Sequence, residues 1–278
     1  MKKICALLLA VLMVTALTVV FASCAGDKQD KKDEKGTETK TVTVGYTIYE
    51  PMNYLDDSGE LTGFDTELAE KVFGALGYKV VFKEIDWAAK YTDLQSGNID
   101  CIWNGFTSNA TDDDGKQRSD KVDFSYNYME NQQAVVVKKG SGIASADDLK
   151  GKIGEAEAGS AGQSYAEDTF GDSVISTVLK QTDALLEVKS GAASFAVVDI
   201  QLAKSYCGKN DYADLEIVDA LTGDLEYYAI GFKKGSDLTA KVNEQLEALA
   251  KDGSLKTLAE KYKLENSVVT DYSDQKKG

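Results

Sequence analysis

The chain has 278 residues, of which 43% are hydrophobic, with 31 Lys and Arg, 46 Asp and Glu, and no histidine. Its formal net charge of −15 disfavours nucleic acid and anionic membrane surfaces as partners. The lack of histidine excludes a Ser-His-Asp triad, a histidine general base and every histidine metal site, which disfavours most enzyme classes.

Residues 1–23 are typical of a secretory signal peptide. Lys2 and Lys3 precede an apolar run over residues 4–22, and the run ends just before Cys24. A cysteine at this point, followed by small residues, predicts signal cleavage and lipidation of Cys24. The run is also long enough to cross a bilayer, so an uncleaved membrane anchor is the alternative. Both interpretations place the rest of the chain outside the cytoplasm, held at the cell membrane.

Residues 24–40 are predicted to be the lipidated cysteine followed by a disordered tether. Residues 27–40 contain no apolar side chain and so have nothing to bury. The remaining length is enough for one large domain or for two lobes of roughly 100 residues each.

Cys101 and Cys207 are the two cysteines that remain after the N-terminal segment. They form no CxxC motif and are widely separated in the sequence, so we expect two separate thiols rather than a disulfide.

The first half of the chain follows the pattern of a parallel α/β sheet. Residues 41–46 alternate apolar and polar side chains as a half-buried strand does, and residues 57–59 mark a turn. A helix is expected to begin at Asp65, which can cap it, and to end at Gly77. A second strand follows over residues 79–82. The apolar helix positions that share one face are Leu68, Val72, Ala75 and Leu76.

Two internal resemblances organise the rest of the chain. LQSGNIDCIWNG, residues 94–105, resembles VKSGAASFAVVD, residues 188–199, and both predict a helix that ends at Ser-Gly before a short strand. AVVVKKGS, residues 134–141, resembles AIGFKKGS, residues 229–236, and both predict an apolar strand that ends in Lys-Lys-Gly-Ser. The alternative is chance similarity in a chain rich in Gly and Val.

The matched segments predict two α/β lobes joined by two hinge crossings. Lobe 1 is expected to comprise residues 41–132 and 229–278, and lobe 2 residues 133–228. Helices over residues 238–262 have apolar positions at helical spacing and are expected to return and cover lobe 1.

The ends of the matched strands predict a ligand site. In open α/β sheets, ligands bind beyond the carboxyl ends of strands, which here carry Asn104, Gly105 and Thr107 on one lobe and Asp199 on the other. Arg118 follows the first strand end and can hold a carboxylate, assisted by the Thr107 hydroxyl. Asp199 can accept hydrogen bonds from an ammonium. Taken singly, Arg118 is more often a surface or ion-paired residue and Asp199 more often a helix cap. Their placement at matched strand ends nevertheless predicts a zwitterionic amino acid as ligand.

Lobe 2 offers a second anion site at Ser160 and Ala161, where a Gly-Ser turn follows a strand and opens a helix. Unpaired N–H groups at a helix start favour a carboxylate, although the turn also serves as an ordinary cap. Tyr49 and Trp87 are aromatic candidates for lining the site, with membership of the core as the alternative.

Several motifs together resemble the polar amino-acid family of ABC-transporter solute-binding proteins, over residues 41 to about 265. The family implies a type II periplasmic-binding fold with two α/β lobes and two hinge crossings, which closes on its ligand and delivers it to a membrane permease. It needs no cofactor and no metal. The segments that carry the resemblance are VGYTIYEPMNYLDDSGELTGFDTELAEKVFGALGYKV, WAAKYTDLQSGNIDCIWNGFT, RSDKVDFSYNYMENQQAVVVKKGS and FAVVDIQLAKSY.

The resemblance also implies roles for the site residues. Arg118 stands before VDFS like the family's carboxylate clamp, and Asp199 in VVDIQLA like its ammonium acceptor. Asn104, Gly105 and Thr107 stand where the family supplies backbone and hydroxyl contacts to the ligand. Tyr49 and Trp87 stand where residues flank the ligand's side chain, and Ser160 stands at the lobe 2 helix start.

Three positions depart from the family pattern. The acidic insertion over residues 109–117 makes the loop before Arg118 longer, and we expect it to be solvated rather than a calcium loop. Ala161 stands where a second hydroxyl residue is frequent. Tyr46 stands where relatives for basic or amide side chains often carry an acid, which lowers the expectation of arginine, lysine or histidine as ligand.

We therefore expect a monomeric, lipid-anchored binding component of an amino-acid ABC importer, with the ligand's side chain left open. One alternative is a sensor module that acts through a partner protein. Another is a dehydratase-like enzyme on the same scaffold, for which Glu50, Asp86 and Glu157 are the candidate acids or bases.

Overall fold

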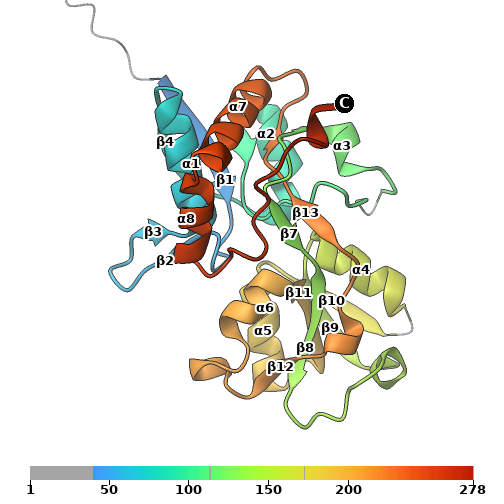
Figure 1. Ribbon diagram of the computed structural model, residues 1–278. Helices are drawn as coiled ribbons and strands as arrows, with labels where there is room; N and C mark the ends of the chain where they lie inside the picture. The colour runs from blue at the N-terminus through green and yellow to red at the C-terminus, as the bar shows by residue number, and fades with distance from the viewer. Residues whose placement is uncertain (1–39, 113, 172, 278) are drawn as a thin grey trace, which may run out of the picture. The chain divides into compact units, whose positions relative to one another are not determined.

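Two five-stranded sheets organise the part of the chain that the computed structural model describes, residues 40–112, 114–171 and 173–277 (Figure 1). These residues form one compact unit. The predicted signal peptide, the lipidation of Cys24 and the tether fall on residues 1–40, which lie outside the described residues except for residue 40.

Sheet 1 has the strand order β4-β1-β5-β14-β6. β1 (Lys40–Tyr46) pairs in parallel with β4 (Tyr78–Glu84) on one side and with β5 (Cys101–Ile102) on the other. β14 (Gly231–Phe232) is antiparallel to both β5 and β6 (Asp123–Phe124). The sheet is therefore completed by a strand that returns from far along the chain.

Sheet 2 repeats this arrangement with the order β10-β9-β11-β8-β12. β9 (Ile153–Glu157) pairs in parallel with β10 (Val174–Val178) and with β11 (Phe195–Asp199). β8 (Gln133–Lys138) is antiparallel to β11 and to β12 (Leu215–Ile217).

Both internal resemblances occupy equivalent places in the two sheets. β5 and β11 each pair with the first parallel strand of their sheet, and β14 and β8 are their antiparallel neighbours. The preceding helices, α2 (Lys90–Ser96) and α5 (Gln181–Ser190), end at Gly97 and Gly191, whose left-handed φ values are 78° and 87°. The predicted helix-to-strand step is thus confirmed in both sheets.

Helix α1 (Phe64–Ala75) differs from the prediction at its start and on its buried face. Gly63 occupies the N-cap position, and Asp65 lies inside the first turn with its side chain buried, so the prediction that Asp65 caps the helix was wrong. Phe73 is buried, whereas Ala75 is exposed. A bulky side chain next to the predicted stripe therefore fills the space between the helix and the sheet.

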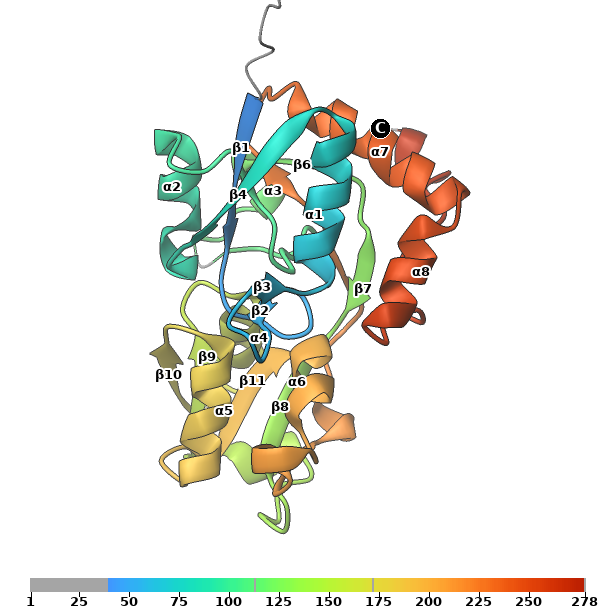
Figure 2. The ribbon, with the colours of Figure 1, turned by 90° about the vertical axis from the view of Figure 1, so that its left-hand side faces the viewer.

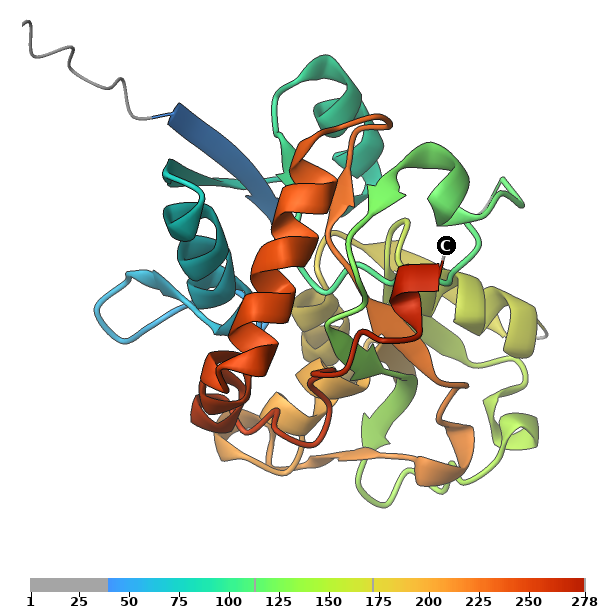
Figure 3. The ribbon, with the colours of Figure 1, turned by 45° about the horizontal axis from the view of Figure 1, so that its top comes forward.

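Helices α4 (Ala161–Thr169), α5 and α6 (Ile200–Tyr206) pack around sheet 2, as Figure 2 shows. Near the other sheet, α7 (Leu238–Lys251) and α8 (Ser254–Lys261) lie beside α1 (Figures 2 and 3). The C-terminal helices thus return to pack against α1. Their buried apolar residues are Val242, Leu246, Leu255 and Leu258.

The chain passes between the sheets twice, and the two passages pair with each other. β7 (Met129–Asn131) is antiparallel to β13 (Glu226–Tyr228), with Asn131 opposite Glu226. The two crossings therefore form a two-stranded ribbon next to both sheets. The remaining short elements are β2 (Tyr54–Leu55), β3 (Leu61–Thr62), α3 (Arg118–Lys121) and the 3₁₀ turns Trp87–Ala89, Ala146–Leu149, Asn210–Tyr212, Asp219–Leu221 and Gln275–Lys277.

The remaining observations concern the cysteines and the length and polarity of the helices. Cys101 is buried and Cys207 is partly buried, and both are free thiols, as expected. Within the described ranges, every helix is too short or too polar to traverse a lipid bilayer.

Candidate functional site

A small cavity lies where the strand ends of the two sheets meet. The residues that line it come from both sheets and include most of those predicted for the site. They are Trp87, Asn104, Gly105, Thr107, Arg118, Glu157, Ser160, Ala161, Gln181 and Asp199. A cation and two carboxyl groups therefore share one enclosed space.

Arg118 is the first residue of α3 and is almost completely buried, with 1% of its surface exposed. Its Nη1 donates to the Thr107 carbonyl at 3.2 Å, and its Nη2 to the carbonyl of Gly159, in the turn after β9, at 3.4 Å. The guanidinium also lies 5.1 Å from the centre of the Phe106 ring. A guanidinium has five N–H donors, so each terminal nitrogen retains one N–H for a further acceptor such as a carboxylate.

The acidic insertion contributes to this arrangement through Asp112. Its carboxylate accepts from Arg118 Nε at 2.9 Å, Lys121 Nζ at 2.8 Å and the Tyr91 hydroxyl at 2.6 Å. These bonds hold the pKa of Asp112 below its usual value despite partial burial. The expectation of a merely solvated insertion was therefore wrong for Asp112, because the loop folds back and orients the guanidinium. No set of acidic or cysteine side chains that could hold a metal occurs in the described ranges.

Asp199 ends β11 on the opposite wall, with 5% of its surface exposed. Its carboxylate accepts hydrogen bonds from three side-chain amides: those of Asn131 at 2.6 Å, Gln133 at 2.7 Å and Gln181 at 2.5 Å. Burial raises the pKa of Asp199, and these amide donors oppose that shift. Asp199 occupies the N-cap position of α6 but makes no capping hydrogen bond, so its carboxylate is not used as a helix cap.

Glu226 is a further carboxyl group, partly buried, that the sequence did not suggest. It lies on the crossing strand β13 and accepts from Asn131, Gln133 at 2.7 Å and the Thr107 hydroxyl at 3.1 Å. Burial and the charge of Asp199 raise the pKa of Glu226 to about 7. The Thr107 hydroxyl thus contacts Glu226, and it is the Thr107 carbonyl that contacts Arg118.

Glu157 ends β9, and 3% of its surface is exposed. Burial, followed by the charge of Asp199, raises the pKa of Glu157 to about 8, while Lys90 and Gln181 act in the opposite direction. Of the three candidate acids or bases, only Glu157 lines the cavity. Asp86 caps the turn at Trp87 by accepting from the Ala88 N–H at 3.0 Å.

The side chain of Asn104 is engaged within sheet 1. It donates to the Thr47 carbonyl at 2.9 Å and to Asn53 Oδ1 at 2.7 Å, and it accepts from the Thr47 hydroxyl at 2.7 Å. Asn104 therefore fixes the end of β5. The next residue, Gly105, donates its N–H to Asp65 at 2.9 Å, so the carboxylate that does not cap α1 instead fastens this strand end.

Ser160 and Ala161 lie at the start of α4. Ser160 is the N-cap, and its hydroxyl accepts from the Gln163 N–H at 3.0 Å, so the capping alternative describes its side chain. Ala161, the first helical residue, lines the cavity.

Tyr49 and Trp87 have different surroundings. Trp87 lines the cavity and packs edge-on against Phe106, with ring centres 5.4 Å apart. Tyr49 is outside the cavity lining, and its hydroxyl lies 2.6 Å from that of Tyr228. Its ring packs directly behind Gly105 and so supports the wall.

We expect Gly105→Ala to lower the free energy of unfolding by about 2–4 kcal/mol, because it combines left-handed strain with a steric clash. Gly105 has φ +58°, and an added Cβ would lie 2.6 Å from Tyr49 Cε1. Denaturant unfolding measures the loss. Gly77→Ala is the matched control: its φ is +79°, nothing lies within 4 Å of the added Cβ, and the strain alone should cost about 1–2 kcal/mol. Equal losses in the two variants would contradict the packing described.

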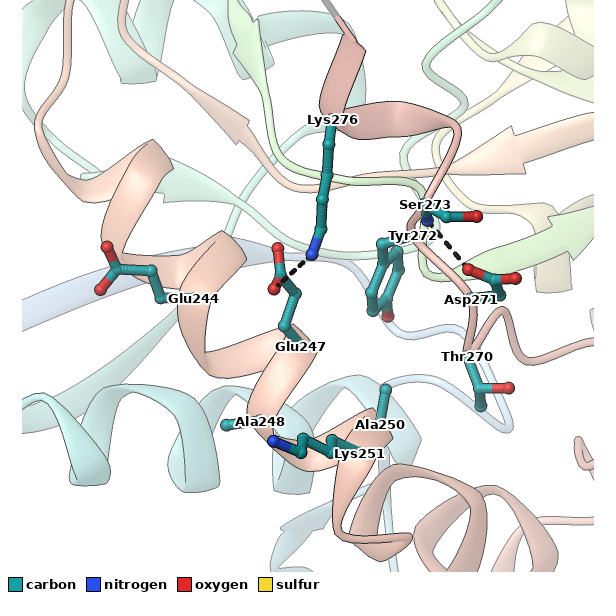
Figure 4. Close-up of a pocket in the computed structure, with 10 residues that line it drawn as sticks. All are labelled: Glu244, Glu247, Ala248, Ala250, Lys251, Thr270, Asp271, Tyr272, Ser273 and Lys276. Carbon is teal, nitrogen blue, oxygen red and sulfur yellow. Dashed lines mark hydrogen bonds and ion pairs between the residues drawn. The ribbon is translucent and has the colours of Figure 1, made fainter.

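A larger pocket lies between α7 and the C-terminal segment, shown in Figure 4. Two of its charged groups pair at the surface: Lys276 binds Glu247 at 2.8 Å, with side-chain exposures of 50% and 36%. Solvent screens such pairs, so this pocket lacks the buried, convergent charges of the cavity between the sheets. We therefore assign the functional site to the latter.

Two α/β lobes crossed twice by the chain, with a charged cavity at the facing strand ends, define the type II periplasmic-binding fold. The model for bacterial extracellular solute-binding proteins, family 3, matches residues 42–265, and the chain belongs to this family. Its location is therefore extracytoplasmic.

Individual relatives agree with this assignment. The chain is 29% identical to the arginine-binding extracellular protein ArtP of Bacillus subtilis (strain 168), over 94% of this chain and 98% of ArtP. It is 34% identical to a probable amino-acid ABC transporter-binding protein of Haemophilus influenzae (strain KW20), over 93% and 96% of the two chains. A solved structure of an ancestral arginine-binding protein bound to arginine is 35% identical, with a TM-score of 0.71, and the match covers 80% of this chain and 97% of that one.

Proposed function

We propose that this chain captures an α-amino acid outside the cytoplasm and delivers it to an ABC permease. The observation that carries the proposal is the pairing of Arg118 and Asp199 on opposite walls of one buried cavity. The ligand's α-carboxylate binds the terminal N–H groups of Arg118, and its α-ammonium binds the carboxylate of Asp199. The names of the relatives, which bind arginine or are amino-acid transport proteins, support this class of ligand.

In this proposal the lobes comprise residues 41–132 with 229–278 and residues 133–228, and they close around the ligand by bending at the crossing ribbon. The Gly159 carbonyl of lobe 2 supports closure because it accepts from two lobe 1 cations, Lys90 Nζ at 2.9 Å and Arg118 Nη2 at 3.4 Å. A bound zwitterion adds two further contacts between the lobes, one to Arg118 and one to Asp199, and so stabilises the closed form.

The remaining predicted site residues act as supports in the same scheme. Trp87 flanks the ligand, while Asn104 and Gly105 shape the strand end that faces it. Ser160 and Ala161 contribute the start of α4, whose N–H groups favour the carboxylate. Tyr49 fixes the wall from behind. Lipidation of Cys24, with residues 25–40 as a tether, keeps the monomeric protein at the outer face of the membrane.

Binding without catalysis is the simplest use of the cavity, because Arg118 and Asp199 are both assigned to holding a zwitterion. The relatives reported above are binding proteins, which supports this choice over the dehydratase-like alternative. Glu157 is the one candidate acid on the cavity wall, and turnover of a prephenate-like substrate would revive that alternative.

Isothermal titration calorimetry on the protein without residues 1–24 tests the proposed function. We expect at least one amino acid to bind, and its decarboxylated and deaminated analogues to bind at least a hundredfold more weakly, because each analogue leaves a buried charge of the site unpaired. An analogue that binds as tightly as its parent amino acid would refute the zwitterion clamp.

A further inference from the structure

Glu157 is a buried carboxyl group on the cavity wall that the zwitterion clamp does not use. It ends β9, next to β11, which ends in Asp199. The two carboxyl groups therefore stand on neighbouring strand ends of the same sheet, and both line the cavity. An α-amino acid has only one α-ammonium, and a single carboxylate is enough to bind it.

The two carboxyl groups differ in how their oxygens are satisfied. Both oxygens of Asp199 accept hydrogen bonds from side-chain amides. Glu157 Oε1 is buried and accepts no hydrogen bond from any described residue. A buried polar atom without a partner costs free energy, so an acceptor of this kind on a cavity wall is typical of a group that a ligand satisfies.

The surroundings of Glu157 favour a donor rather than an acceptor as its partner. Asp199 lies close enough to raise the pKa of Glu157, and Asp86 acts in the same direction. Lys90, whose Nζ binds the Trp87 and Gly159 carbonyls, is the cation that opposes them. An incoming N–H group offsets the unfavourable effect of Asp199 and Asp86 on an ionised Glu157, most strongly when it carries a positive charge.

We propose that Glu157 recognises the side chain of the bound amino acid by accepting a hydrogen bond from an N–H group on it. This inference rests on the proposed function, because it needs Arg118 and Asp199 to hold the α-carboxylate and α-ammonium. The ligand class is then an amino acid with a cationic or an amide side chain. Tyr46, which lowered this expectation from sequence, lies outside the cavity lining and packs edge-on against Phe82.

Pairs of amino acids that differ mainly in the side-chain donor test the proposal in the wild-type protein. Lysine against norleucine tests a cationic donor, and glutamine against methionine tests a neutral amide. We expect the donor-bearing member of at least one pair to bind at least tenfold more tightly in calorimetry, and the favoured pair identifies the kind of donor. Equal affinities within both pairs would overturn the proposal.

Glu157→Leu removes the acceptor and should abolish the preference, by weakening the donor-bearing ligand at least tenfold while changing the other member of the pair less than threefold. Glu157→Gln keeps an acceptor oxygen without the charge, so it should weaken lysine more than glutamine and serves if the leucine variant does not fold. Glu155→Gln is the matched control, since Glu155 lies on the same strand but outside the cavity lining. It should leave every affinity within threefold.

The outcomes separate this inference from the proposed function. If no α-amino acid binds, or if binding ignores the α-ammonium and the α-carboxylate, the proposed function fails and the inference with it. If α-amino acids bind with both requirements but the preference for a side-chain donor is missing, or persists in Glu157→Leu, only the role of Glu157 fails.

Discussion

Arg118→Met is expected to weaken amino-acid binding by about a hundredfold to a few thousandfold, measured by calorimetry. Removing one partner of a buried ion pair typically costs about 3–5 kcal/mol, and each 1.4 kcal/mol is a factor of ten in affinity. The affinity of Arg118→Lys should lie between those of Arg118→Met and the wild type. An ammonium restores the charge but not the two parallel N–H groups that fit a carboxylate.

The variant is expected to fold, so its loss of binding can be interpreted. Without Arg118, Asp112 still accepts from Lys121 Nζ and from the Tyr91 hydroxyl, so its carboxylate keeps two partners. Lys116→Met is the matched control, because it also removes a cation from this segment, but Lys116 has 66% of its side chain exposed. The Lys116→Met variant should bind the amino acid with wild-type affinity. Affinity of Arg118→Met within threefold of the wild type would show that Arg118 does not contact the ligand.

The fold was predictable from sequence because it repeats. The segments that lead into β5 and β11 both carry Ser-Gly at a left-handed helix end, followed by an apolar strand. This pattern is local and does not depend on what packs around it. The strand ends then place Arg118 and Asp199 at one cavity through topology alone, without knowledge of any side-chain contact.

The residues that support the site could not be predicted from sequence, because their contacts join segments that are not related by any local pattern. Asp112 reaches Arg118 only because the acidic insertion folds back, and its local sequence is that of any solvated loop. Glu226 meets Asn131 and Gln133 because the two crossings pair across nearly a hundred residues. A carboxylate close to the predicted return crossing near residue 228 was the available signal. Asp65 was assigned to the helix start because capping is the commonest local use of an aspartate, and here a distant N–H outcompeted it.

Asp199→Asn is expected to weaken amino-acid binding at least a hundredfold, because it replaces the negative charge that faces the α-ammonium with a neutral amide. The carboxylate is desolvated and oriented by three amides, so its interaction with a cation is only weakly screened by solvent. Glu226→Gln is the matched control: it removes one carboxyl group from the same hydrogen-bond network, but Glu226 is outside the cavity lining. Its affinity should stay within tenfold of the wild type.

A double-mutant cycle then separates the ammonium contact from general damage to the site. The wild type should prefer an amino acid over the α-hydroxy acid with the same side chain by a large factor, because the hydroxy acid leaves Asp199 without its cation. In Asp199→Asn that preference should largely vanish, since a neutral amide offers no negative charge that favours an ammonium over a hydroxyl group. If the variant weakens both ligands equally and keeps the preference, the coupling energy is zero and the α-ammonium binds elsewhere. Arg118 would then hold one end of a ligand whose other end is recognised by a different group.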